Sequence, residues 1–506
     1  MFLEFLNCRR RESVLRTDAM SFSAGWRRCR VSVICLMGCV LLCAGTASDV
    51  LGQTALSPSR TDSAESISIK APSATVTTVT NVADVPAAMF EYVARPEPEF
   101  AWHCRRSLQH EQRTVHLLEV TSQKWHDIVW KHSVEIYEPK ELSHPGHALL
   151  FVTGGSRLKD PDEGDLRFGT SLADLCGARV IVLRQVPNQP LFGGKVEDDL
   201  ITETWLRYLE SGDTTWPLLF PMVKSAVKTM DAVQQFTNSQ GRQTGPDSSA
   251  QKYAVEHFVI AGASKRGWTS WLTPVVDQRI VATAPIVIDV LNFRAQMQHQ
   301  LKTWGRFSDQ IIDYTRKGLV KGPDEAETDR EVALRTMMDP YTYRKRLTLP
   351  KLLIVGTNDP YWVVDSMNLY WDELAGPKFV RQVPNAGHSL NGGRDAALTT
   401  LAVFFRHIAA GQDLPDVAWE FQDGADQLRL QIRSTAKPSE VRLWTARSTD
   451  PDFRNDQWEA QVVTASDGVY VGRQDVPAEG HVAMFGEVEF QFHDLPWSIT
   501  TLVYRR

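Results

Sequence analysis

The sequence predicts an α/β domain with a mostly parallel sheet that carries helices on both faces, followed by a smaller C-terminal β-sandwich. Short, continuous apolar runs such as 147–152 and 179–183 alternate with helix-compatible segments, which is typical of parallel strands buried on both faces. From about residue 414 the pattern changes to short runs in which apolar and polar residues alternate. The length of 506 residues also exceeds that of one typical domain.

Composition narrows the class of partners. A hydrophobic content of 43% and a charged content of 23% are ordinary for a globular protein. The formal net charge is −6, and no basic run lies outside the N-terminal region. We therefore expect no nucleic-acid partner.

The N-terminal region is predicted to be a signal peptide, residues 1–47. A basic stretch precedes an apolar run at 31–44, and small residues at 45–47 offer a cleavage site. The run is shorter than the ~20 residues of a membrane span, so no transmembrane span is expected in the mature chain. The protein is thus expected to be exported to the periplasm or the medium, with Met1 or Met20 as the start.

Two further features concern the mature chain. Residues 48–85 are rich in Ser, Thr, Ala and Asp and are predicted to form a disordered linker. Five of the seven cysteines lie in the leader, which leaves Cys104 and Cys176. These two can form one disulfide in an oxidising compartment or remain two thiols, and neither arrangement indicates a metal site.

The first domain is assigned to residues 86–413 and the sandwich to 414–506. The first domain is expected to open with an antiparallel pair of strands and to carry a helical lid insertion at about 291–349. Helices are also expected at 205–236, interrupted by Pro217 and Pro221, at 363–374 and at 396–409, with a polar surface loop at 238–251. The expected strands are 114–120, 126–137, 147–152, 179–183, 258–261, 283–290, 351–355 and 379–383.

The most informative stretch is 256–271, where an apolar run ends at Gly262 and is followed by Ser264 and Gly267. A serine between small residues, at a turn from a buried strand to a helix, is the nucleophile elbow of the α/β-hydrolases. The usual pattern is G-x-S-x-G, and here the second glycine comes one position later. The glycines fit neither a P-loop nor a dinucleotide-binding fingerprint. An ordinary helix-capping serine is the alternative.

A serine nucleophile needs a base and a group that orients the base, and in this fold the chain order is serine, acid, histidine. Asp359 follows an apolar strand 95 positions after Ser264, and His388 follows the next strand 29 positions later. The three residues are therefore predicted to form a catalytic triad. Asp289 is the runner-up for the acid, and Asp365 is the third choice.

Neighbouring residues complete the predicted site. The oxyanion hole is expected to use the backbone N–H of Lys265 and that of Gly155 or Ser156. The basic side chain of Arg266, in the first turn of a helix, is unfavourably placed for the helix dipole, which favours a role facing an anionic ligand. The predicted substrate-binding residues are Trp268, Trp362, Tyr361 and Arg266.

Four motifs together resemble the PhoPQ-activated pathogenicity-related protein family. They are G-A-S-K-R-G-W-T-S-W-L (262–272), P-I-V-I-D-V-L-N (285–292), G-T-N-D-P-Y-W (356–362) and P-N-A-G-H-S-L (384–390). The resemblance covers roughly 86–506. It implies an α/β-hydrolase fold and an exported protein, and it puts Ser264, Asp359 and His388 on the triad positions. The family includes a secreted autocrine proliferation repressor, a signalling protein, and the resemblance implies no substrate.

These observations predict an exported serine hydrolase, most simply a carboxylic-ester hydrolase that acts through an acyl-enzyme. The alternatives are a serine peptidase or amidase, and a non-catalytic secreted binding or signalling protein on the same scaffold. The expected partner is a small-molecule ester or a glycan-linked substrate. No cofactor and no metal are expected, and the sequence leaves the oligomeric state open.

Overall fold

The computed structural model describes residues 85–155, 159–243 and 254–506. The predicted signal peptide and nearly all of the predicted linker lie outside these residues. Regular structure begins with α1 (Ala88–Ala94), close to where the sequence predicts order to start. In the described part of the chain, no helix is both long and apolar enough to cross a membrane.

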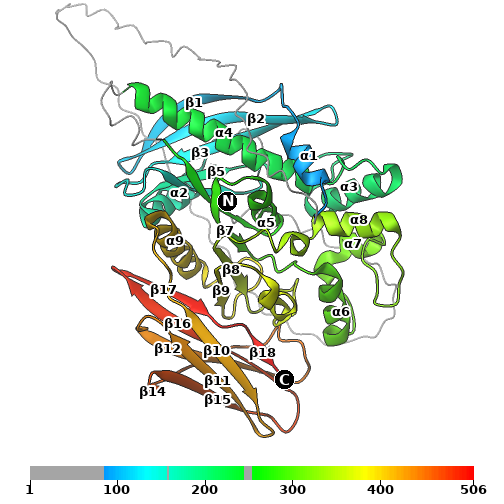
Figure 1. Cartoon of the computed structure of the whole chain (residues 1–506), viewed down its shortest axis with the longest axis vertical. Coiled ribbons are helices and arrows are strands. Elements are labelled where there is room, and N and C mark those ends of the chain that lie inside the picture. Colours follow the sequence, from blue (N-terminus) through cyan, green and yellow to red (C-terminus); the bar gives the residue numbers. More distant parts are fainter. Residues whose placement is uncertain (1–84, 156–158, 244–253) are drawn as a thin grey trace, which may run out of the picture. The chain divides into compact units, whose positions relative to one another are not determined.

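The first domain is built on a nine-stranded sheet in the order β1-β2-β3-β5-β4-β6-β7-β8-β9 (Figure 1). The first three strands are antiparallel to one another and β3 is antiparallel to β5, whereas all later neighbours are parallel. The strands are β1 (Ala101–His110), β2 (Arg113–Trp125), β3 (Ile128–Tyr137), β4 (His147–Val152), β5 (Arg179–Leu183), β6 (His257–Ala263), β7 (Ile280–Ile286), β8 (Lys351–Gly356) and β9 (Lys378–Val383).

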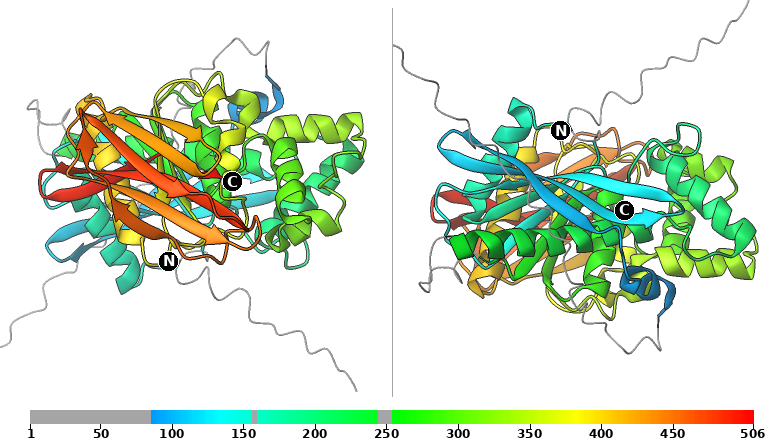
Figure 2. Two further views of the ribbon diagram at one scale, coloured as in Figure 1. Left: turned by 90° about the horizontal axis from the view of Figure 1, so that it is seen from below. Right: turned by 90° about the horizontal axis from the view of Figure 1, so that it is seen from above.

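Both faces of this sheet are buried along β4 to β8, as the continuous apolar runs predict. In β4, Leu149 and Phe151 face one apolar core, and Leu150 and Val152 face the other. Helices α2 (Glu163–Cys176) and α9 (Arg394–Ala410) supply side chains to the first of these cores. Helices α1, α4 (Leu219–Gln243) and α5 (Lys265–Val276) supply side chains to the second. Figure 2 shows α4 running alongside β1 to β3.

Several predicted boundaries are wrong. The helical segment predicted at 205–236 is two helices, α3 (Glu197–Ser211) and α4, and Pro217 lies between them as predicted, whereas Pro221 does not interrupt α4. Pro221 falls in the first turn of α4, where its missing N–H costs no intrahelical hydrogen bond. The predicted loop at 238–251 is helical up to residue 243, and residues 244–253 lie outside the described part of the chain.

The segments that follow the elbow differ from prediction in two places. The strand predicted at 283–290 is β7, which begins and ends earlier than predicted. It ends at Ile286, because the next residue, Val287, adopts a positive φ of 46°. The helix predicted at 363–374 is instead two short 3-10 helices, Ser366–Leu369 and Trp371–Glu373.

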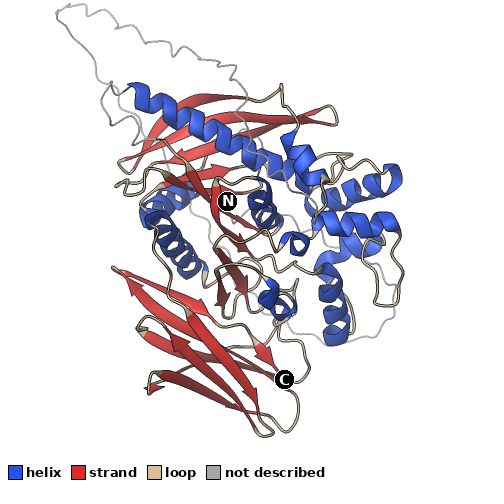
Figure 3. Cartoon of the chain, viewed as in Figure 1, coloured by secondary structure: helices blue, strands red, loops and turns tan. Residues whose placement is uncertain are grey.

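The insertion between β7 and β8 is helical, as predicted (Figure 3). Its elements are α6 (Phe293–Trp304), a 3-10 turn (Asp309–Ile311), α7 (Ile312–Arg316), α8 (Asp329–Met338) and a second 3-10 turn (Pro340–Tyr343). Side chains from α6, α7 and α8 line a pocket next to Ser264.

The C-terminal part consists of two antiparallel sheets, in the orders β10-β11-β15-β14 and β13-β12-β16-β17, with β18 also paired to β16. Side chains of β11, β12, β16 and β17 share one apolar core, which confirms the predicted sandwich. The strands are β10 (Val417–Asp423), β11 (Gln427–Ser434), β12 (Glu440–Ser448), β13 (Glu459–Val462), β14 (Ala465–Ser466), β15 (Val469–Asp475), β16 (His481–Phe492), β17 (Leu495–Thr500) and β18 (Tyr504–Arg505).

The topology is that of an α/β-hydrolase, as predicted. The elbow follows β6, the helical insertion follows β7, and the loops with the candidate acid and base follow β8 and β9. Of the two mature-chain cysteines, Cys104 is exposed and Cys176 is buried, and both are free thiols.

Candidate active site

Ser264 sits at a strained turn between β6 and α5. Its backbone has φ 57° and ψ −125°, a conformation that L-residues rarely adopt. The two glycines allow this turn. A Cβ at Gly262 would lie 2.6 Å from the carbonyl oxygen of Arg266, and one at Gly267 would lie 2.5 Å from Cγ2 of Ile288. Both positions therefore require glycine, although their spacing departs from the usual pattern.

A chain of hydrogen bonds joins the three residues of the predicted triad. Ser264 Oγ lies 3.0 Å from His388 Nε2, and His388 Nδ1 lies 2.8 Å from Asp359 Oδ2. The other carboxylate oxygen accepts from the backbone N–H of Tyr361 at 3.0 Å. An aspartate on Nδ1 selects the tautomer with hydrogen there, so Nε2 is left to accept the serine proton.

The other two candidate acids are bound elsewhere. Asp289 accepts from the Ser366 hydroxyl at 2.6 Å, and burial, together with nearby Asp359, raises its pKa to about 6. Asp365 lies 2.6 Å from His299 Nε2 and 2.8 Å from Arg505 Nε. Of the three candidates, Asp359 is therefore the one that contacts His388.

The side chain of Lys265, the residue after the serine, turns to the start of α3. Its ammonium lies 2.8 Å from Asp198 Oδ2, and Tyr314 donates to the other oxygen of that carboxylate at 3.1 Å. Burial disfavours the charged ammonium, but Asp198 outweighs this effect, and the pKa of Lys265 is raised. Lys265 therefore carries its charge into the wall of the pocket together with a partner.

The prediction that Arg266 binds substrate is wrong. Its side chain is fully buried and does not line the pocket. The guanidinium donates to both carboxylate oxygens of Glu197, at 2.7 and 2.8 Å, and to the carbonyl of Val186 at 2.5 Å. It also packs on the turn after β4, where a Cβ at Gly154 would lie 2.6 Å from it. Arg266 thus ties the elbow to α3 and to this turn.

The acidic start of α3 is the functional feature that sequence reasoning missed. Glu197 and Asp198, at this helix start, are the partners of the two basic residues after the nucleophile. Burial alone would raise the pKa of Glu197, but Arg266 and Lys265 lower it to about 2. The sequence feature that could have indicated this pairing is the presence of two cations, Lys265 and Arg266, at a helix N-terminus. The helix dipole disfavours positive charge there, so acidic partners are needed.

The candidate oxyanion donors lie at the start of α5 and after β4. Lys265 is the first residue of α5, so its backbone N–H lies outside the intrahelical hydrogen-bond ladder. The turn after β4 is held by the N–H of Gln185, which donates to the carbonyl of Gly154 at 2.8 Å, and Gly155 follows with φ 97°. Ser156 lies outside the described residues.

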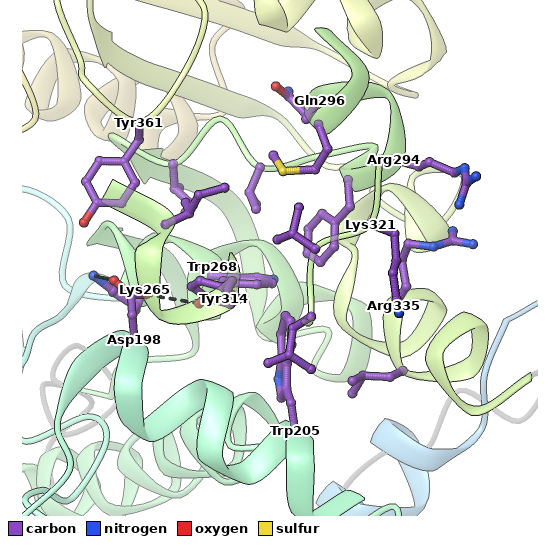
Figure 4. A pocket seen from close by; sticks show the side chains of 18 of the residues that line it. Asp198, Trp205, Lys265, Trp268, Arg294, Gln296, Tyr314, Lys321, Arg335 and Tyr361 are labelled. Atoms are coloured by element: carbon purple, nitrogen blue, oxygen red, sulfur yellow. Dashed lines mark hydrogen bonds and ion pairs between the residues drawn. The ribbon is translucent and has the colours of Figure 1, made fainter. Parts of the chain in front are cut away.

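A pocket of about 140 Å³ opens beside Ser264 and His388. Figure 4 shows Lys265, Asp198 and Tyr361 on one side of it, and Arg294, Lys321 and Arg335 on the opposite side. The ring of Tyr361 also packs on the His388 ring, with centroids 4.3 Å apart. Most of the remaining lining side chains are apolar, among them Trp205, Trp268, Val290, Phe293, Met297 and Trp362. The structure thus brings the predicted Trp268, Tyr361 and Trp362 to one pocket.

Comparison with known proteins identifies the family. The family model described as PhoPQ-activated pathogenicity-related protein matches residues 89–454. The chain belongs to this family. A curated relative, autocrine proliferation repressor protein A of Dictyostelium discoideum, is 33% identical over 437 residues, which cover 79% of this chain and 85% of the relative.

Solved structures similar to this PhoPQ-related chain include two esterases. Acetyl xylan esterase 1 from Thermoanaerobacterium sp. is 17% identical, with a TM-score of 0.43, over 64% of this chain and 94% of that one. The glucuronoyl esterase from Solibacter usitatus is 11% identical, with a TM-score of 0.36, over 65% of this chain and 94% of that one.

A sandwich loop of this PhoPQ-related chain, residues 453–458, is hydrogen-bonded to the loops that carry Asp359 and His388. The family match ends within this loop. The amide of Asn358, next to Asp359, lies within hydrogen-bond distance of the carbonyls of Phe453, Arg454 and Asp456, the shortest distance being 2.8 Å. The side chain of Asn385, three residues before His388, exchanges two hydrogen bonds with the backbone of Trp458, at 2.7 and 3.0 Å.

Proposed function

We propose that this PhoPQ-related chain is an exported serine hydrolase that cleaves carboxylic esters. The observation that carries the proposal is the hydrogen-bonded series Ser264–His388–Asp359 at a strained strand-to-helix turn. That turn holds the serine in an unfavourable backbone conformation, as expected where geometry serves chemistry. The pocket beside the serine provides space for a substrate.

In the proposed mechanism, Ser264 Oγ attacks the ester carbonyl carbon while His388 Nε2 takes the hydroxyl proton. The N–H of Lys265 and one from the turn at Gly155 or Ser156 stabilise the negative oxygen of the tetrahedral intermediate. The intermediate collapses to an acyl-enzyme, and the alcohol leaves with the proton from Nε2. Water, deprotonated by His388, then hydrolyses the acyl-enzyme and releases the acid. Throughout, Asp359 orients the imidazole and stabilises its charged form.

Trp268, Tyr361 and Trp362 are proposed to contact the substrate, because each lines the pocket. The same triad supports amide or peptide hydrolysis, which needs the same nucleophile and base but a poorer leaving group. A second candidate is a secreted signalling protein without catalysis, and the similarity to autocrine proliferation repressor protein A favours it. Retention of all three triad residues in hydrogen-bond geometry favours the enzyme.

Labelling with a fluorophosphonate probe tests the proposal, because only an activated serine reacts quickly. The wild-type mature chain is expected to be labelled, and Ser264→Ala and His388→Ala are expected to lose the label. Ser270→Ala is the matched control. Ser270 is buried in α5, the helix that follows Ser264, and donates to the carbonyl of Arg266 at 2.9 Å. Its substitution should leave labelling intact.

Folded wild type that neither takes the label nor hydrolyses p-nitrophenyl acetate would contradict the enzyme proposal and favour the signalling candidate. A kcat/KM comparison of matched esters and amides then separates esterase from amidase activity. Export is tested separately. N-terminal sequencing of protein recovered outside the cytoplasm should begin near residue 48, as the leader at 1–47 predicts.

A further inference from the structure

The end of the pocket that lies away from the triad is charged. Arg294, Lys321 and Arg335 line this end (Figure 4), and their side chains are 38%, 27% and 31% exposed. Two carboxylates, those of Glu327 and Glu331, line the same end. The lining side chains at this end therefore carry one positive charge in excess.

The two arginines share one carboxylate. Glu327 accepts from Nη1 of Arg294 at 2.9 Å, and from Nε and Nη2 of Arg335, each also at 2.9 Å. Lys321 has a carboxylate of its own, because its ammonium lies 3.1 Å from Oε1 of Glu331. Two guanidinium groups beside one carboxylate leave one positive charge without an anion, and a second anion would be attracted to them.

Both guanidinium groups keep hydrogen-bond donors for such an anion. A guanidinium has five N–H donors, and Glu327 uses only some of them. Among the described residues, Nη1 of Arg335 and Nε of Arg294 have no hydrogen-bond partner, and neither nitrogen is buried. Accessible donors thus remain on two neighbouring side chains that line the pocket.

Nearby charges outside the pocket wall have other partners. Asp339 acts electrostatically on Arg335, but it is 5% exposed and accepts from three backbone N–H groups, at 2.8–3.1 Å. Arg330, on the same helix as Arg335, does not line the pocket and donates to the carbonyls of Leu209 and Glu210, at 2.8 and 2.9 Å. Arg330 therefore has a structural role, which links α8 to α3.

The rest of the pocket wall is mainly apolar. Trp268, Phe293 and Leu334 are among its lining side chains, and Lys265 is paired with Asp198 at 2.8 Å. A ligand that spans the pocket therefore meets the nucleophile at one end, apolar side chains along its length and cationic donors at the other end. An ester with an apolar chain and a remote anionic group matches this order.

We propose that the substrate is an ester with a carboxylate at the far end of an apolar chain, and that Arg294 and Arg335 bind this carboxylate. Hydrogen bonds between guanidinium and carboxylate are charge-assisted and about twice as strong as neutral ones. The carboxylate can belong to the acid part or to the alcohol part of the ester, and the experiment distinguishes the two. The inference rests on the proposed function for the reaction, but not for the binding.

Isothermal titration calorimetry on the Ser264→Ala chain tests the inference without requiring hydrolysis. One series of ligands is the monoethyl esters of linear dicarboxylic acids, from succinic to suberic acid. The other is the acetyl esters of linear ω-hydroxy acids of the same lengths. Each ligand is compared with a neutral analogue that has a primary amide in place of the carboxylate. At least one carboxylate ligand is expected to bind about tenfold more tightly than its amide, and its series identifies the part of the ester.

Two variants and one control assign the preference to the pocket arginines. Arg335→Gln and Arg294→Gln, each added to Ser264→Ala, should weaken binding of the carboxylate ligand about tenfold and leave the amide within about twofold. Arg330→Gln removes a cation from the same helix outside the pocket, so it should leave both affinities within about twofold. An increase in ionic strength from about 0.05 M to about 0.5 M should weaken binding of the carboxylate ligand but not of the amide.

Two results would overturn the inference. One is that no carboxylate ligand of either series binds more tightly than its amide. The other is that Arg330→Gln lowers the affinity as much as Arg335→Gln and Arg294→Gln do, because the overall charge of the chain would then explain the preference. If a carboxylate ligand binds preferentially but the wild type hydrolyses none of the esters, the proposed function fails and the role of Arg294 and Arg335 stands.

Discussion

The two sides of the candidate triad are held in different ways. Ser264 is positioned by its own strained backbone, by the flanking glycines and by ion pairs from α3, all within the first domain. The loops of Asp359 and His388 are instead tied to the C-terminal sandwich through Asn358 and Asn385. A local geometry thus fixes the nucleophile, whereas a second domain supports the acid and the base.

Because of this difference, substitutions on the two sides should affect different properties of the protein. Damage to the nucleophile side should act mainly on folding, because its ion pairs are buried and the elbow is packed against β7. Damage to the sandwich contacts should act mainly on the rate, because they fix the orientation of groups that are otherwise on loops.

Glu197→Gln should have the largest effect on stability, because it removes the carboxylate that pairs with the buried charge of Arg266. We expect a loss of about 3–5 kcal/mol in the free energy of unfolding, measured by urea denaturation at pH 7. Glu203→Gln is the control. Its partners Arg207 and Lys195 are 35% and 28% exposed, so the cost should stay below about 1 kcal/mol. Similar losses in both variants would contradict the role of the buried pair.

The effect of Glu197 also has a defined pH dependence. Its pKa in the folded state is about 2, below the ordinary value of 4.5, so its stabilising contribution is complete above pH 4.5. It is lost as the pH falls from 4.5 towards 2. The stability difference between wild type and Glu197→Gln should therefore shrink over this range, and a constant difference would argue against the ion pair.

Asp289→Asn should change stability in the opposite direction, because it removes a buried carboxyl group that has no ion-pair partner within the described residues. The pKa of Asp289 is raised from 3.8 to about 6, so ionisation destabilises the folded wild type as the pH rises through this range. Relative to the wild type, the variant should gain about 3 kcal/mol between pH 3.5 and pH 7.5, since one pKa unit corresponds to about 1.4 kcal/mol. Denaturant titrations at the two pH values measure this gain, and no change would be inconsistent with a buried carboxyl.

Gly267→Ala tests the packing of the elbow. The new methyl group would lie 2.5 Å from Ile288 Cγ2 and 2.8 Å from the carbonyl oxygen of Gly262, so the helix must move. A loss of about 1–3 kcal/mol in the free energy of unfolding is expected. Gly387→Ala, next to His388, is the control, because its nearest contact is 3.6 Å away. Thermal melts that rank the two variants in the reverse order would refute this account.

Asn385→Ala tests the sandwich side with the smallest effect on stability. Loss of its two hydrogen bonds to Trp458 should cost about 1–2 kcal/mol. For an ester that the wild type hydrolyses, kcat should fall about tenfold with little change in KM, because the base is misaligned while the pocket stays intact. Asn368→Ala, which loses one hydrogen bond to the sandwich at Val503, is the control and should leave kcat within about twofold. An unchanged kcat in Asn385→Ala would remove the distinction between the two sides.

The local features of the fold could be predicted from the sequence. Apolar runs predicted the buried strands, and the glycines around Ser264 predicted the elbow because only they permit its backbone geometry. The order of the strands with their following loops predicted that Ser264, Asp359 and His388 would meet at one edge of the sheet, since parallel strands end together. The positions of turns and short helices, as at 363–374, were predicted less well, because packing rather than local propensity sets them.

Which side chains pair, and which face the pocket, can be seen only in the folded structure. Arg266 and Lys265 are neighbours in the sequence, yet one is buried against Glu197 and the other reaches the pocket wall with Asp198. Partners such as these are about 60 or more positions apart along the chain. Their pairing follows from how separate elements pack, and no local pattern encodes it.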